Sequence, residues 1–538
     1  MNTPSSLTHR LVEHVVQTRY ESIPEAAHDA AKIFILDSIG VALSGTRVPL
    51  VGDLKQLAAT WGRGEDARIW GTGERVPAGT AAFINGYQIH NQEWDCVHEP
   101  AVVHPMAVVL ATLLADAERT GGITGRQLIS GCSIAVDVAT GIGRSARNKL
   151  RFFRPAMCGA LGATAALAHW RGFDMHTTRS ALGLAYSQLS GTMQAHVEGS
   201  PVLPMQIGFN TRAALNAVEL AARGIAGPME FLEGPFGYFT LIDPEWERTA
   251  LEHIDLQPAI CELSHKPFPS GRATHGGVDG ALSLCALHAI EVESIRQIRV
   301  IAPPLVIQLV DRPARADMAA SYARLCLPYV AATALLKGSV DVTDFTPESF
   351  ADPKRLALAS RIVVQRDANP SLNALSPQRV EISLVDGREY AMDLPDVLGA
   401  PGRPLSREQH LAKFRRAAAS GLRPMPEAGI HRCQRLMESS AKVFIAGADI
   451  KHLAEKKSPI AMKWRDEMER LEKPVVAAIH GFALGGGLES TLCCHYRVAV
   501  ASAKVGLPEV QEARAGAPGR SRRRADLQGQ RLLHHRLQ

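Results

Sequence analysis

The chain has 538 residues, of which 46% are apolar, 21% charged and 5% aromatic, and this is the composition of a globular protein with more than one domain. No apolar stretch approaches the roughly 18 residues that a membrane-spanning helix requires, and no signal peptide is evident at the N-terminus. The formal net charge of +5 arises from the Arg-rich residues 511–538, so the rest of the chain is neutral overall, which argues against a nucleic-acid-binding surface on the folded body.

The first 264 residues are expected to form a helical domain. Residues 24–43 show helical periodicity, with Ser22 as N-cap and Gly45 as the stop. Residues 104–120 form a second apolar pattern, which opens at Pro105 and closes at two glycines. Further Ala-rich helices are expected at residues 156–170 and 211–223.

The pattern changes to a small α/β domain over residues 265–400. Alternating apolar residues predict three strand segments, and the third contains the Asp386-Gly387 hairpin signal. The strands are expected at residues 295–302, 360–365 and 380–394, and the helices between them at 314–325 and 330–337. Residues 401–438, which include a helix at 406–419, return to the helical domain.

The densest polar cluster lies within residues 90–105, HNQEWDCVHEPAVVHP, where three His and three acids precede an apolar helix. A zinc site of the helical type needs two His four residues apart, but His98 and His104 are six apart and Pro100 interrupts them. The cluster is therefore either a polar loop that caps helices or a carboxylate and imidazole placed for proton transfer. A helix N-terminus at this point favours an anionic substrate.

This cluster resembles the signature of the MmgE/PrpD family, in which an Asn-Gly pair precedes H-x-x-D-F-D-D and then H-P-S. Asn85-Gly86 fills the first place, Glu93-Trp94-Asp95 fills the D-F-D places, and Met106 replaces the usual Ser. Further segments resemble the family in the right order, namely residues 19–45, 191–200, 208–228, 232–238, 265–275 and 327–338.

The resemblance implies a mainly α fold, with an all-helical core and a small α/β lid. It implies a lyase of the 2-methylcitrate dehydratase or cis-aconitate decarboxylase type, which removes a proton from a small di- or tricarboxylic acid. A homodimer without metal or organic cofactor is expected, with no specific nucleic-acid or membrane partner. An isomerase or epimerase of a dicarboxylate on the same site is the alternative. Nine unpaired-looking Cys, none spaced as CxxC, favour a cytoplasmic location.

Site residues follow from the resemblance position by position. Asp95 and His104 are expected to be the acid–base pair, Lys266 to hold a carboxylate or donate a proton, and Tyr329 to be a second proton donor. The expected substrate-binding residues are His98, Arg154, Arg272 and His275. Structural roles compete for three of these: a turn cap for His98, a surface salt bridge for Arg272 and a core position for His275.

Two departures from the family pattern leave the substrate and the reaction type open. Arg154-Pro155-Ala156 stands where several family members have His-Pro-Thr, and Leu203 stands where the family has Lys. One imidazole has become a guanidinium and one cation is missing. Dehydration, decarboxylation and isomerisation therefore remain alternatives.

Residues 439–510 resemble the crotonase (enoyl-CoA hydratase) superfamily, with Ala448 and Gly486 in the oxyanion-hole places and Glu489 and Glu509 as the acid–base carboxylates. The segment lacks the strands that precede the first motif in that family, so a truncated α/β fragment is expected. A bifunctional enoyl-CoA hydratase and an inactive fusion product are the alternatives. Residues 511–538 are expected to be disordered, and their sudden Arg enrichment is typical of an end read out of frame.

Overall fold

The computed structural model describes residues 6–438 and, beyond them, only short strands. The chain divides into a first unit that ends at Glu455 and a second that begins at Lys456. The later strands are β8 (Ile445–Ala446), β9 (Val476–Ile479), β10 (Phe482–Leu484), β11 (Tyr496–Ala499) and β12 (Lys504–Gly506). β9 pairs in parallel with β11, as β10 does with β12. The crotonase-like candidates Ala448, Gly486, Glu489 and Glu509, and the Arg-rich tail, lie outside the described residues.

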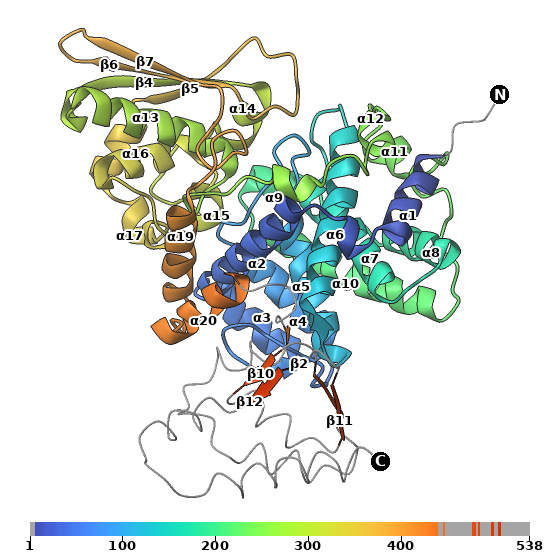
Figure 1. Ribbon diagram of the computed structural model, residues 1–538. Helices are drawn as coiled ribbons and strands as arrows, with labels where there is room; N and C mark the ends of the chain where they lie inside the picture. Colours follow the sequence, from blue (N-terminus) through green and yellow to red (C-terminus); the bar gives the residue numbers. More distant parts are fainter. Residues whose placement is uncertain are drawn as a thin grey trace, which may run out of the picture. The chain divides into compact units, whose positions relative to one another are not determined.

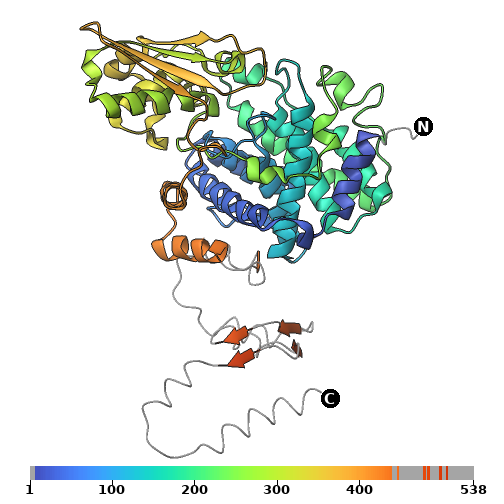
Figure 2. The ribbon, with the colours of Figure 1, turned by 45° about the horizontal axis from the view of Figure 1, so that its top comes forward.

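Long helices build the first part of the chain (Figures 1 and 2). They are α1 (Leu7–Gln17), α2 (Glu25–Gly45), α3 (Leu50–Ala58), α4 (Ala78–His90), α5 (Pro105–Arg119), α6 (Gly125–Ser145), α7 (Arg154–Trp170), α8 (Met175–Tyr186) and α10 (Val202–Ala222). α5 and α7 are buried on nearly all sides because α4, α6 and α10 surround them. Gly162 lets α7 approach α6 closely, since a Cβ there would lie 2.3 Å from the Ala135 carbonyl oxygen.

The lid contains a four-stranded sheet in the order β5-β4-β6-β7. Its strands are β4 (Ile295–Ala302), β5 (Ile362–Arg366), β6 (Gln378–Leu384) and β7 (Glu389–Leu394). β4 and β5 are parallel, whereas β6 pairs antiparallel with both of its neighbours. α13 (His275–His288) and α16 (Leu327–Lys337) pack against the sheet, and the chain then returns through α19 (Arg407–Ala419), which packs on α2, to α20 (Glu427–Glu438) (Figure 1).

The fold confirms most of the predicted elements and corrects two. The hairpin forms at Asp386-Gly387, where Gly387 has a φ of 91°. The helix expected at residues 314–325 is reduced to α15 (Ala320–Ala323). The Arg312 and Arg315 guanidinium groups stack on the Tyr322 ring, 4.8 and 5.0 Å from its centroid, and hold an irregular loop.

Ser22 does not cap α2, as the sequence predicted. It closes a short 3₁₀ turn, where its hydroxyl donates to the Arg19 carbonyl oxygen, and Pro24 precedes the helix. Within the described part of the chain, no single helix is long and apolar enough to cross a membrane. α2 and α3 meet that requirement only as a pair, across a bend of 92°.

Candidate active site

The polar cluster forms where two distant segments meet. α4 ends at His90, and the loop that follows pairs Val97 with Ser264 in an antiparallel bridge. This bridge brings Lys266, at the entrance to the lid, beside Asp95. The next helix, α5, begins at Pro105 with His104 at its N-cap, so its N-terminus faces the same cluster.

Two residues of the loop have a left-handed backbone. Glu93 and Val102 both have a φ of 54°. The conformation is especially unfavourable for a β-branched side chain such as Val102. Such strain persists where the surrounding contacts impose it, as they often do at functional sites.

Asp95 is the centre of the cluster. Its carboxylate, which is fully buried, accepts a hydrogen bond from His90 Nδ1 at 2.9 Å and lies 3.4 Å from His104 Nδ1. Lys266 Nζ is 3.5 Å from Asp95 and donates to Glu93 Oε2 at 3.0 Å. Glu93 Oε1 completes the ring of contacts at 3.4 Å from His90 Nε2.

The charged groups of the cluster shift one another's pKa values towards the ionised forms. Burial alone would raise the pKa of Asp95, but His90, His104 and Lys266 outweigh it and hold that pKa well below its usual range. Burial likewise opposes ionisation of Glu93, yet Lys266 and the histidines lower its pKa to about 2. The pKa of His90 is raised, because Asp95 and Glu93 outweigh its burial.

His104 differs from its neighbours. Burial, with the Lys266 charge, lowers its pKa even though Asp95 favours the charged form. His104 is therefore neutral at pH 7. His104 Nδ1 lies 3.4 Å from Asp95 and makes no hydrogen bond at that distance; a slightly closer approach with the proton on Nδ1 would leave the lone pair on Nε2, the arrangement of an oriented general base.

A cavity opens beside this cluster, between the helical domain and the lid. The centre of a water molecule can occupy about 60 Å³ of it, which is room for a small organic acid. His90, Glu93 and His104 line one polar part of it, and His196 and Arg272 are the other polar side chains in the lining. The apolar lining is Val97, Val102, Leu150, Phe153, Pro155, Met193, Leu203, Ala273, Leu309, Val310, Leu325 and Leu375.

The two arginines predicted to bind substrate are already paired. Arg154 is fully buried and donates to both oxygens of Asp243, at 3.0 and 3.2 Å, and to Asn373 Oδ1 at 3.1 Å. Arg272 reaches the cavity wall, but it donates to Glu99 Oε1 at 2.8 Å and to main-chain carbonyl oxygens. Their binding roles stay predictions, and the geometry favours structural ones.

The two predicted histidines also lie apart from the reacting centre. His98 Nε2 is 3.0 Å from Glu262 Oε2, and His98 Nδ1 accepts from the Ala101 N–H at 3.2 Å, so its ring ties down a turn. His275 is buried, with Nε2 3.2 Å from the Ser270 carbonyl oxygen. Burial depresses its pKa far below the usual value, so the imidazole is neutral.

Tyr329 lies inside the lid. Its hydroxyl donates to the Asp344 carbonyl oxygen at 2.5 Å and accepts from Arg355 at 3.1 Å. Tyr329 is not among the residues that line the cavity described above. Its proton-donor role stays a prediction.

Two residues of the site, His90 and Glu93, were not predicted from the sequence, although both stand in the same polar run as Asp95. The five-residue spacing between His90, at the end of α4, and Asp95 is the feature of the sequence that could have indicated them.

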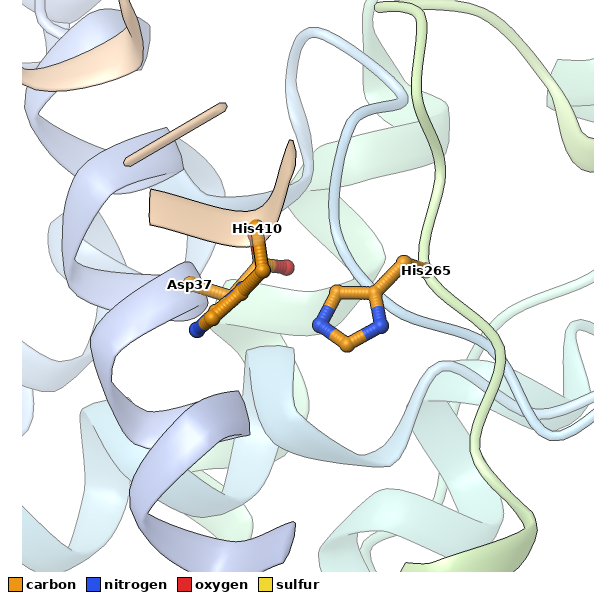
Figure 3. A group of neighbouring side chains, drawn as sticks. All are labelled: Asp37, His265 and His410. Carbon is orange, nitrogen blue, oxygen red and sulfur yellow. The ribbon is translucent and has the colours of Figure 1, made fainter. Parts of the chain in front are cut away.

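Two groups of side chains have the composition of a metal site. His90, Asp95 and His104 form one, and the other joins Asp37 of α2, His265 and His410 of α19, whose ligand atoms lie within 4.8 Å of one another (Figure 3).

An ammonium group already neutralises each carboxylate. Lys413 Nζ is 2.7 Å from Asp37 Oδ1, and Lys266 Nζ is 3.5 Å from Asp95. A second cation at either place would be repelled. We therefore keep the expectation of a metal-free site as a prediction.

Comparison with known proteins finds two families along the chain. The MmgE/PrpD N-terminal domain matches residues 9–248 and the MmgE/PrpD C-terminal domain matches residues 268–439. The enoyl-CoA hydratase/isomerase family matches residues 436–516.

Individual relatives agree with this division. The cis-aconitate decarboxylase of Mus musculus is 28% identical over 412 residues, which are 73% of this chain and 82% of that protein. The peroxisomal bifunctional enzyme of Cavia porcellus is 49% identical over 83 residues, 14% of this chain and 11% of that enzyme. The probable enoyl-CoA hydratase of Bacillus subtilis (strain 168) is 46% identical over 83 residues, 14% of this chain and 32% of that protein. The chain thus spans less than a third of these two enoyl-CoA relatives.

Proposed function

The chain belongs to the MmgE/PrpD family over residues 9–439, and from that premise we propose that it is a lyase in which His104 removes a proton next to a carboxylate of a small organic acid. The substrate would be a di- or tricarboxylate, the class to which the cis-aconitate of the mouse relative's name belongs. The reaction would be dehydration or decarboxylation.

A neutral imidazole beside a buried carboxylate, at a polar part of a cavity wall, is the observation that carries the proposal. His104 Nε2 accepts the proton and becomes an imidazolium, which Asp95 at 3.4 Å stabilises. In a dehydration the imidazolium then protonates the departing hydroxyl group. In a decarboxylation no proton is first removed from carbon: CO₂ leaves, the electrons of the broken carbon–carbon bond form a carbanion, and His104, protonated from solvent, donates a proton to that carbon.

The N-terminus of α5 supports the same chemistry. Its first N–H groups have no partners within the helix and carry a partial positive charge. His104 stands at this N-cap, so negative charge that develops on the substrate carboxylate lies near those N–H groups.

Solvent deuterium incorporation tests the proposal without knowledge of the product. A panel of small di- and tricarboxylic acids is incubated with the protein in D₂O, and mass spectrometry detects carbon-bound deuterium. We expect incorporation into at least one acid, and its loss in His104→Gln. His288→Ala is the control, since His288 is exposed in the lid. Incorporation by His104→Gln at the wild-type rate would refute the proposal.

A further inference from the structure

The cations around the cavity are occupied by protein groups. Lys266 is bound to Glu93 and Asp95. Arg154 is bound to Asp243, and Arg272 to Glu99. None of these three side chains keeps a charge free for a substrate that carries several carboxylates.

Arg324 has no such carboxylate partner among the described residues, and neither has Arg312, whose guanidinium contacts His196, the Leu309 carbonyl oxygen and the Tyr322 ring. The Arg324 side chain is buried, with a relative exposure of 6%, and its Nε has no hydrogen-bond acceptor among residues 6–438. Neither does its guanidinium form an ion pair with any described carboxylate; it stacks on Phe345, 4.8 Å from the ring centroid. A buried cation without an anion is costly, so an anion is expected to complete this place.

Arg324 is not itself one of the residues that line the cavity, but its main chain adjoins two of them. Leu325 and Gly271 line the cavity, and the Gly271 N–H donates to the Arg324 carbonyl oxygen at 3.0 Å. Burial lowers the pKa of Arg324 to about 10, while Tyr87 and Glu93 favour its charged form. The guanidinium is therefore charged at pH 7.

Met193, Leu203, Leu309 and Leu375 form an apolar part of the cavity wall, and His196, whose ring nitrogens lie 3.3 and 3.2 Å from Arg312, belongs to the same lining. Leu203 and Met193 are buried, with exposures of 4% and 8%. A carboxylate placed against these four apolar side chains would lose its water without gaining a donor, because none of them has an N–H or O–H group. A hydrocarbon branch would gain the free energy of leaving water.

On the premise of the proposed function, we infer that the substrate is a dicarboxylic acid with a hydrocarbon branch, and that Arg324 is the counter-charge for its second carboxylate. The first carboxylate adjoins the reacting carbon and lies at the N-terminus of α5, beside His104. The branch lies against Leu203 and Met193.

A shape-matched pair of acids tests the inference. Propane-1,2,3-tricarboxylate and 2-isobutylsuccinate share a succinate frame, but the first carries CH₂–COO⁻ where the second carries an isobutyl group. Calorimetry gives the dissociation constants, and deuterium incorporation gives the exchange rates. We expect 2-isobutylsuccinate to bind at least about tenfold more tightly, since roughly three apolar carbons are buried, and to exchange faster.

The other outcomes are distinct. Equal affinity, or preference for the tricarboxylate with deuterium exchange, would overturn the inference and leave the lyase proposal standing. Failure of both acids to bind or exchange, together with a panel that shows no deuterium incorporation, would overturn both.

Variants assign the preference to the named residues. Leu203→Lys should reverse it towards the tricarboxylate, while Leu203→Met, which keeps the wall apolar, should retain it. Arg324→Gln should weaken binding of 2-isobutylsuccinate by about tenfold or more, and Arg324→Lys should recover part of the loss. Unfolding curves without ligand identify any variant that fails to fold. Unchanged affinity in a folded Arg324→Gln would remove Arg324 from the site.

Discussion

Asp95→Asn separates the charge of Asp95 from its shape. The amide fills the same buried space, but His90, His104 and Lys266 lose the carboxylate that lies 2.9, 3.4 and 3.5 Å from them. The imidazolium formed by proton abstraction then loses its nearest buried counter-charge, and of the carboxylates in the cluster only Glu93 is left. By comparison with other acid–base and carboxylate–imidazole pairs, we expect the rate of deuterium exchange to fall by about 10³- to 10⁴-fold.

Asp95→Asn should also change the pH dependence of kcat/KM, in a direction that follows from the pKa of His104. His104 must be neutral to accept a proton, and its pKa is already below 6.5 because of burial and Lys266. Asp95 raises that pKa, so its removal should move the acid limb of kcat/KM to still lower pH. Rates of deuterium exchange measured between pH 4 and 8 locate the acid limb in the wild type and in Asp95→Asn.

Stability should change as well. The folded pKa of Asp95 is depressed, so its contribution is complete above the unfolded value of about 3.9 and is lost as the pH falls through the folded pKa. We expect a cost of about 3 kcal/mol at pH 7, shrinking below about pH 4. Urea unfolding measures both, with the exposed Asp393→Asn as control. An exchange rate reduced less than tenfold, or an equal stability loss at pH 3 and pH 7, would refute this reasoning.

Three further predictions concern residues away from proton transfer. Arg154→Ala removes the cation paired with the buried Asp243, which keeps only the hydrogen bonds from Tyr238 and Asn148, and should lower the free energy of unfolding by about 3–5 kcal/mol; a loss below about 1 kcal/mol in urea would contradict this pairing. Gly162→Ala places a Cβ 2.3 Å from the Ala135 carbonyl oxygen and should cost about 1–3 kcal/mol, whereas Gly52→Ala, which meets nothing within 4 Å, should stabilise α3 by about 0.5–1 kcal/mol; similar melting shifts would show that the helices can separate. Lys413→Met leaves Asp37 unpaired and should cost about 3–5 kcal/mol, and Zn²⁺ should not raise the melting temperature of the wild type; a rise that Asp37→Asn abolishes would establish a metal site there.

The sequence alone predicts contacts between functional residues that lie close together in the chain. His104 and Pro105 indicate the N-terminus of a helix, and Asp95 lies nine residues before His104. The contact between Asp95 and His104 could therefore be expected from the sequence alone. Lys266 depends on the pairing of Val97 with Ser264, across more than 160 residues. No periodicity indicates that register, and only the family resemblance pointed to Lys266.

Whether an arginine is available to a substrate carboxylate depends on its partners in the fold and not on its residue type. Arg154 and Arg272 have the right chemistry for a carboxylate, but the carboxylates that meet them belong to Asp243 and Glu99, 89 and 173 residues away in the chain. Arg324, which no motif marked, is left without such a partner within residues 6–438.

The helices show a similar limit. α10 begins at Val202, nine residues before the helix expected from the Ala-rich pattern. Pro204 and Gly208 weaken the helical signal in that stretch. Pro204 nevertheless lies in the first turn, where its missing N–H is no loss, and Gly208 allows contact with Phe83, since a Cβ there would be 2.7 Å from the Phe83 ring.

The bridge between Val97 and Ser264 has a mechanical consequence. The strand segment that leads into the lid is hydrogen-bonded to the loop that carries Asp95, and Lys266 follows it by two residues. A displacement of the residues that lead into the lid would therefore also displace the Lys266 ammonium group, whose charge lowers the pKa of Glu93 and of Asp95. Because Lys266 lowers the pKa of His104, moving that ammonium group away would raise the pKa, so the docked arrangement of the two halves is the one that keeps His104 neutral and able to accept a proton.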